Sequence, residues 1–155
     1  MCPVSRKLLK LRSKFEGTIV AELKKRKIRF TYEPDKLDFF SDVRGGRCPA
    51  CGHKPVQKKR YYVPDFRIKQ YKKATDFGVF ETFTVYIEGK GKLTPSERTK
   101  LLDIRKHNPL ADIKIVFMRD NKLSRNSTTR YSEWATANGF PNCVGPENMP
   151  KEWFK

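Results

Sequence analysis

The segment that most constrains the fold is residues 79–87, which has the composition of a half-buried β-strand. It is rich in the β-branched and aromatic residues that strands favour. Successive side chains of a strand point to opposite faces, so Val79, Phe83, Val85 and Ile87 share one apolar face. The pattern predicts a strand that packs this face into a core and carries charge on the other.

The charged end of this strand is the sequence Glu88-Gly89-Lys90. Residues two apart on a strand lie on the same face, roughly 6.5–7 Å from each other, so the carboxylate and the ammonium would project together. Upstream, Asp65 follows a proline in a short aromatic strand predicted over 61–66. Because proline cannot donate to a strand ladder, this position marks an edge or a bulge. An aspartate followed by Glu-x-Lys is typical of metal-dependent nucleases, although the bare pattern also occurs by chance on solvated faces of charged proteins.

These residue types together suit phosphodiester hydrolysis. Mg²⁺ prefers oxygen ligands, usually one or two carboxylates with waters and substrate phosphate, and it makes hydroxide available near neutral pH. Asp65 and Glu88 would provide the carboxylates. The ammonium of Lys90 would orient the attacking water and offset charge that builds on the phosphate. The sequence therefore predicts these three residues as catalytic, with Mg²⁺ or Mn²⁺ as cofactor.

A fourth carboxylate lies in the apolar arc of a helix predicted over 13–27. At about 100° per residue, Glu16 falls between Leu23 and Val20 on the face predicted to be buried. Two explanations remain open. Ser13-x-x-Glu16 matches a capping box, in which the glutamate reaches back to the N-cap amide, or the carboxylate has a functional task.

The remaining patterns complete an α/β fold. Thr94, Pro95 and Glu97 form a strong helix start, and the apolar run at 113–118 is typical of a buried strand. The predicted elements are a basic arm (1–12), a helix (13–27), a short strand (28–32), an acidic, aromatic connection (33–43), a cysteine-containing insertion (44–60), strands (61–66 and 79–88), a helix (94–107), a strand (113–118), a basic loop (119–130) and a short helix (131–138) closed by Gly139. Residues 13–155 would thus form a single domain with an αβββαβ core, a mixed sheet flanked by helices, on which the aromatic C-terminal tail packs.

The charge balance predicts a polyanionic partner. Lys and Arg number 34 against 17 acidic residues, a formal charge of +17; DNA or RNA fits because phosphate contacts release counterions. A membrane surface is disfavoured, since no apolar run approaches the roughly 20 residues of a spanning helix. Residues 1–30 are too highly charged for a signal peptide, which favours a reducing cytoplasm. The residues expected to contact nucleic acid are Arg6, Lys7, Lys10, Arg12, Lys14, Lys58, Lys59, Arg60, Lys92, Arg125 and Arg130.

Cys48 and Cys51 lie in the sequence Cys-Pro-Ala-Cys-Gly, which has the shape of a zinc knuckle. A structural zinc needs four ligands, so His53, Cys2, Cys143 or the equivalent pair of a second subunit would have to complete the site. A redox function is disfavoured, because a redox Cys-x-x-Cys should open a helix in a thioredoxin-like unit. A structural Zn²⁺ and an empty reduced pair both remain open.

Several segments occur in one characteristic order. They are Ser13-Lys14-Phe15-Glu16, Val63-Pro64-Asp65-Phe66, Glu88-Gly89-Lys90-Gly91, Leu101-Leu102-Asp103-Ile104-Arg105 with His107, Asp112-Ile113-Lys114-Ile115-Val116-Phe117, and Pro150-Lys151-Glu152-Trp153. In these segments the chain resembles the bacteriophage endonuclease I family, Holliday-junction resolvases of the PD-(D/E)xK (restriction-endonuclease-like) nuclease superfamily. The resemblance covers about residues 13–155.

The resemblance implies a homodimer that cleaves branched DNA with an active site of Glu16, Asp65, Glu88 and Lys90. Asp65, Glu88 and the carbonyl of Gly89 would hold the first of two metal ions, and Glu16 would help to hold the second. Lys90 would position the water. In-line attack would leave a 5′-phosphate, with each subunit nicking one of two opposed strands.

The chain departs from the family at 44–60. Family members that exchange segments between subunits do so through a short bridge before the catalytic aspartate, and here that position holds the longer Cys48/Cys51 insertion. Two alternative functions stay open: a nuclease of the same chemistry that acts on linear ends or mismatches, and a non-catalytic zinc-knuckle protein that binds nucleic acid.

Overall fold

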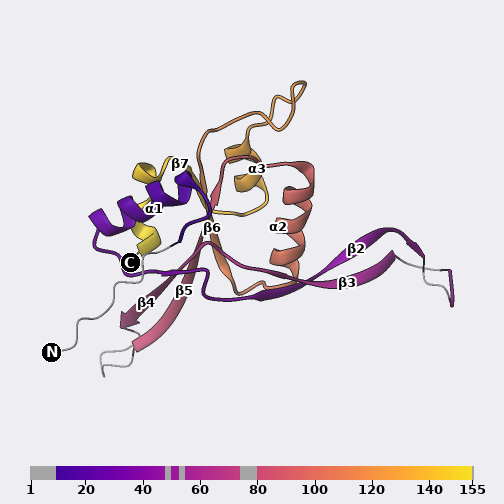
Figure 1. Cartoon of the computed structure of the whole chain (residues 1–155), viewed down its shortest axis with the longest axis horizontal. Helices are drawn as coiled ribbons and strands as arrows, with labels where there is room; N and C mark the ends of the chain where they lie inside the picture. Colours follow the sequence, from indigo (N-terminus) through magenta and orange to yellow (C-terminus); the bar gives the residue numbers. More distant parts are fainter. Residues whose placement is uncertain (1–9, 48–49, 53–54, 74–79, 155) are drawn as a thin grey trace.

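The computed structural model describes residues 10–47, 50–52, 55–73 and 80–154, with a β-sheet at its centre and helices on both sides (Figure 1). The helices are α1 (Lys14–Lys25), α2 (Pro95–His107) and α3 (Tyr131–Ala137), and two 3₁₀ turns, η1 (Pro146–Asn148) and η2 (Lys151–Phe154), end the chain. The strands are β1 (Thr31–Tyr32), β2 (Leu37–Arg47), β3 (Pro55–Tyr62), β4 (Phe66–Lys73), β5 (Phe80–Lys90), β6 (Asp112–Phe117) and β7 (Asn142–Val144).

The main sheet has the strand order β1-β4-β5-β6-β7. The pairs β1/β4 and β4/β5 are antiparallel, whereas β5/β6 and β6/β7 are parallel. Without the β2–β3 hairpin, the chain order from α1 to β6 is α, three strands, α, strand. The predicted mixed α/β core is confirmed.

Each face of the sheet carries its own hydrophobic cluster, which follows from the alternation along β5. Val85 and Ile87 pack with α1, Phe66 and the C-terminal Trp153. Tyr86, from the same strand, packs in the cluster with residues of α2 and α3. The expectation that the aromatic tail packs on the body is confirmed, because only 6% of Trp153 is exposed.

The hairpin formed by β2 and β3 corrects the prediction of a connection at 33–43 and an irregular insertion at 44–60. These two strands make a separate two-stranded sheet that projects from the body (Figure 1). Only its base is anchored, by Phe39 and Tyr62, which are 2% and 3% exposed. Residues 57–60 of β3 are polar on both faces, so this stretch lacks the apolar alternation that would have revealed a strand.

Smaller differences occur at the ends of elements. The strand predicted at 28–32 is reduced to β1, because Lys27 takes a positive φ of 59° and the N–H of Ile28 donates to the carbonyl of Leu23 at 2.9 Å, completing the helix end. The strand predicted at 61–66 is divided between β3 and β4. Strand β7 was missed, since three residues are too few to show a period.

Among the helices of the described residues, none is long and apolar enough to cross a bilayer.

Candidate active site

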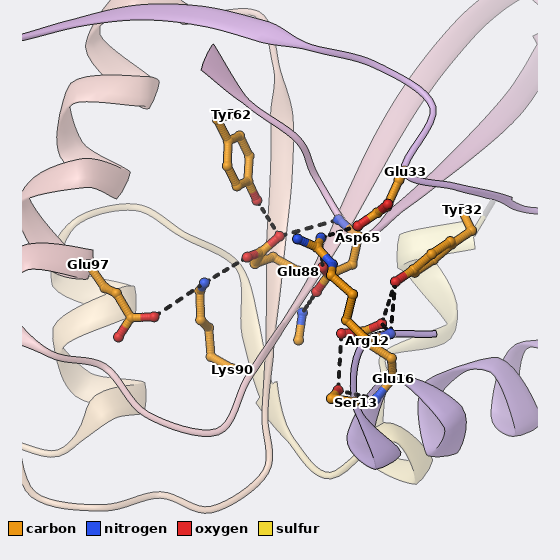
Figure 2. A network of polar contacts seen from close by, with 11 residues as sticks. Arg12, Ser13, Glu16, Tyr32, Glu33, Tyr62, Asp65, Glu88, Lys90 and Glu97 are labelled. Carbon is orange, nitrogen blue, oxygen red and sulfur yellow. Dashed lines mark hydrogen bonds and ion pairs between the residues drawn. The ribbon is translucent and has the colours of Figure 1, made fainter. Parts of the chain in front are cut away.

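The register of β4 and β5 brings Asp65 and Glu88 together. Phe66 pairs with Ile87, so Asp65 and Glu88 occupy the next opposed positions. The N–H of Asp65 donates to Oε2 of Glu88 at 3.3 Å, and the N–H of Gly89 donates to Oδ2 of Asp65 at 2.8 Å. The two carboxylates are 6% and 4% exposed. Figure 2 shows them at the centre of a network of polar contacts.

The proximity of the two carboxylates is electrostatically unfavourable. Burial raises the pKa of Asp65, the negative charge of Glu88 raises it further, and the hydrogen bond from Gly89 only partly offsets them, so the pKa reaches about 7. The pair Asp65 and Glu88 therefore favours a compensating positive charge, which a proton, a side chain or a metal ion could supply.

Lys90 supplies part of this charge. Its Nζ lies 2.7 Å from Oε1 of Glu88 and 3.6 Å from Oε1 of Glu97 on α2. Burial lowers the pKa of Lys90, but the charge and hydrogen bond of Glu88 outweigh this and raise the pKa above its ordinary value. Lys90 consequently remains an ammonium near neutral pH, able to donate hydrogen bonds and to stabilise negative charge.

The sequence left two explanations open for Glu16, a helix cap and a functional role, and the contacts of this residue bear on both. Its side chain is buried, with 7% exposed. Its N–H donates to Oγ of Ser13 at 3.1 Å, as in a helix cap, but its carboxylate accepts the N–H of Arg12 at 3.0 Å instead of that of the N-cap residue. The hydroxyl of Tyr32 also donates to it, at 2.7 Å. Burial alone would raise the pKa of Glu16, but these hydrogen bonds outweigh it and lower the pKa. Arg12 links this carboxylate to the pair Asp65 and Glu88, because its N–H donates to Glu16 and its guanidinium lies 3.5 Å from Oδ1 of Asp65.

Arg12 and Glu33 also belong to this network. Arg12 was predicted as part of a basic arm, but its Nη2 lies 3.5 Å from Oδ1 of Asp65 and its guanidinium forms an ion pair with Glu33. Glu33 has a positive φ of 45°, and its N–H donates to the carbonyl of Asp65 at 2.9 Å. No sequence pattern indicated either contact, because the contacts join three separate segments: the chain before α1, the chain after β1 and the chain before β4.

Tyr62 is another residue of this network whose contact the sequence did not indicate. It ends β3, is 3% exposed, and its hydroxyl donates to Oε2 of Glu88. The sequence showed it only as one aromatic residue of a strand.

The carboxylates of the site are possible ligands of a divalent cation. Within the described residues, no three His, Cys, Asp or Glu side chains converge as a preformed metal site. The candidate ligands are therefore the two carboxylates of Asp65 and Glu88. Two are enough for Mg²⁺, because this ion usually takes only one or two carboxylates and completes its shell with waters and phosphate. The raised pKa of Asp65 shows that positive charge is favoured beside this pair. The residues fit Mg²⁺.

The other predicted cations are spread over the surface. Lys10, Lys14, Lys58, Lys59, Arg60, Lys92, Arg125 and Arg130 are exposed, while Arg6 and Lys7 lie outside the described residues. Lys59 forms an ion pair of 2.7 Å with Asp38 across the hairpin. These positions remain predicted DNA contacts.

The zinc knuckle stays a prediction. Cys48 and His53 lie outside the described residues, as does Cys2, and Cys51 is exposed in the turn of the hairpin. Cys143 lies on β7, in the body of the molecule and away from that turn (Figure 1). Completion of a knuckle by Cys143 of the same chain is thus disfavoured.

Comparisons with known proteins show the family to which the chain belongs. A family described as phage endonuclease I matches residues 3–155. The chain is 30% identical to endonuclease I of Escherichia phage T7 over 151 residues, 97% of this chain and 82% of that protein. It is also 30% identical to endodeoxyribonuclease 1 of Enterobacteria phage T3 over 130 residues, 83% of this chain and 68% of that protein. These matches set aside the non-catalytic alternative. The chain with this carboxylate–lysine centre is an endonuclease that belongs to the phage endonuclease I family.

Proposed function

We propose that this endodeoxyribonuclease resolves branched DNA, Holliday junctions in particular, by paired nicks that leave 5′-phosphates. The proposal rests on one observation above all: Asp65, Glu88 and Lys90 form a buried contact network, with Glu16 close by. A formal charge of +17 suits the substrate, because DNA phosphates attract such a surface.

The proposed cofactor is Mg²⁺ or Mn²⁺, two ions for each active site. Asp65, Glu88 and the carbonyl of Gly89 would hold one ion, and Glu16 would help to hold the other. When bound, the ions would stabilise charge on the phosphate and activate water for attack. Arg12 lies against Asp65 in the protein alone, so its guanidinium would compensate the carboxylate until a metal ion does so.

Lys90 has a defined role in this proposal. Its ammonium is held by Glu88 and Glu97 and keeps its proton. It would therefore orient the attacking water by hydrogen bonding and offset the charge that develops on the phosphate.

Selectivity for junctions requires two active sites in a fixed relation. We infer a homodimer in which each subunit nicks one of two opposed strands, so the spacing of the two centres selects branched DNA over duplex. The support for this step is membership of the phage endonuclease I family.

The test is cleavage of a labelled four-way junction and of duplex DNA of equal length at matched salt, each with Mg²⁺ and with EDTA. Paired nicks confined to the junction and abolished by EDTA are expected. Equal cutting of both substrates would contradict junction selectivity, and cutting in EDTA would contradict metal dependence.

A further inference from the structure

The hydroxyl of Tyr62 lies inside the protein, at the end of β3 that reaches the active site. The ring packs in the hydrophobic cluster on the α2 side of the sheet. A buried hydroxyl needs a hydrogen-bond partner, because leaving it without one costs free energy. Its partner is Oε2 of Glu88 (Figure 2). A phenylalanine would fill the same apolar space, so packing alone does not account for the hydroxyl.

The carboxylate of Glu88 has three donors around it. An ionised carboxylate has about four acceptor positions. The hydroxyl of Tyr62 and the N–H of Asp65 take positions on Oε2, and the ammonium of Lys90 takes one on Oε1. Three donors from three directions fix the orientation of this carboxylate and leave an acceptor position on Oε1.

Tyr62 is itself held in place. Nζ of Lys100 on α2 lies 5.2 Å from the centre of its ring, within the range of a cation–π contact. A phenol is protonated near neutral pH, so the hydroxyl is the donor in its contact with Oε2 of Glu88.

We propose that Tyr62 is a positioning residue, whose hydroxyl holds Glu88 in the orientation that binds the metal ion. The inference rests on the proposed function, because it assigns Glu88 to the metal. Partners that hydrogen-bond to metal ligands typically contribute about 10–100-fold in metal affinity or activity. Tyr62 meets this description, since it contacts a ligand and not the ion.

The test compares Tyr62→Phe with Tyr86→Phe. Tyr86 is a matched control: it is buried in the same cluster, lies on the same strand as Glu88, and its hydroxyl donates to a different carboxylate, Asp35, at 3.2 Å. Titration calorimetry with Mg²⁺, without DNA, measures metal affinity directly. We expect Tyr62→Phe to weaken Mg²⁺ binding about 10–100-fold and Tyr86→Phe to leave it unchanged, with thermal unfolding showing that both variants fold.

A double-mutant cycle with Glu88→Gln tests whether Tyr62 acts through Glu88. If it does, adding Tyr62→Phe to Glu88→Gln causes no further loss of Mg²⁺ affinity. An equal loss in both backgrounds, or wild-type affinity in Tyr62→Phe, would overturn the inference while leaving the active site intact. Full cleavage by Glu88→Gln would instead overturn the proposed active site, and the inference with it.

Discussion

At the scale of single residues, the active site is built from two buried carboxylates at opposed positions and from the cations around them. Asp65 has a pKa of about 7 in the folded protein against an ordinary value of 3.8. A raised pKa gives a contribution to stability that is fully present below pH 3.8 and is lost as pH rises through 7. Between these values the protein should become less stable with rising pH.

Asp65→Asn removes this dependence while keeping an acceptor for the N–H of Gly89. In EDTA at pH 8 the variant should be more stable than the wild type, by at most about 4 kcal/mol, and the difference should disappear toward pH 4. Urea unfolding across this pH range measures the effect. Parallel profiles for the two proteins would contradict the raised pKa.

Lys90→Gln tests the role of the ammonium. Glutamine can still donate to Glu88 but carries no charge, so kcat should fall by about 10²–10³-fold with little change in DNA affinity. Lys92→Gln is the control, because Lys92 is exposed two residues further on; it should weaken binding slightly and leave kcat intact. An equal loss of binding and kcat in Lys90→Gln would make Lys90 only a phosphate contact.

At the scale of elements, the position of α1 against β5 decides where Glu16 lies relative to Asp65 and Glu88. Gly89 lies at this contact: a Cβ there would be 2.8 Å from Cδ1 of Ile19 and 3.4 Å from the ring of Phe15. At Gly91, two residues on, a Cβ would make only an ordinary van der Waals contact, with Cε of Met118 3.9 Å away. Gly89→Ala should therefore destabilise the protein by about 1–3 kcal/mol, while Gly91→Ala is tolerated. Thermal unfolding of the two variants measures the difference, and equal stability would show that α1 adjusts freely.

The sequence predicted those elements whose pattern is local. The half-buried strand that contains Val85 and Ile87 and the capped helix that starts at Thr94 were both recognised. The β2–β3 hairpin was not, because its polar strands stabilise each other by pairing and bury little apolar surface. The carboxylate–lysine motif could be identified from spacing, but the contacts of Arg12, Glu33 and Tyr62 could not, since each joins segments far apart in the chain.

At the scale of the whole molecule, positive charge should dominate DNA affinity. Arg125 and Arg130 are exposed in and beside the basic loop before α3. Each phosphate contact that is lost reduces the slope of log K against log salt by about 0.9, so neutralising both residues should lower the slope by roughly twice that amount and weaken junction and duplex binding alike. A slope unchanged by Arg125→Gln with Arg130→Gln would exclude them from the DNA interface.

Whether the Asp65–Glu88–Lys90 centre performs the cleavage is tested most directly by measuring the binding and the cutting of one four-way junction by Asp65→Ala. We expect wild-type affinity at matched salt and no cleavage with Mg²⁺, because the substitution removes a metal-binding carboxylate but no DNA-binding cation. Cleavage at the wild-type rate would place the active site elsewhere on the protein.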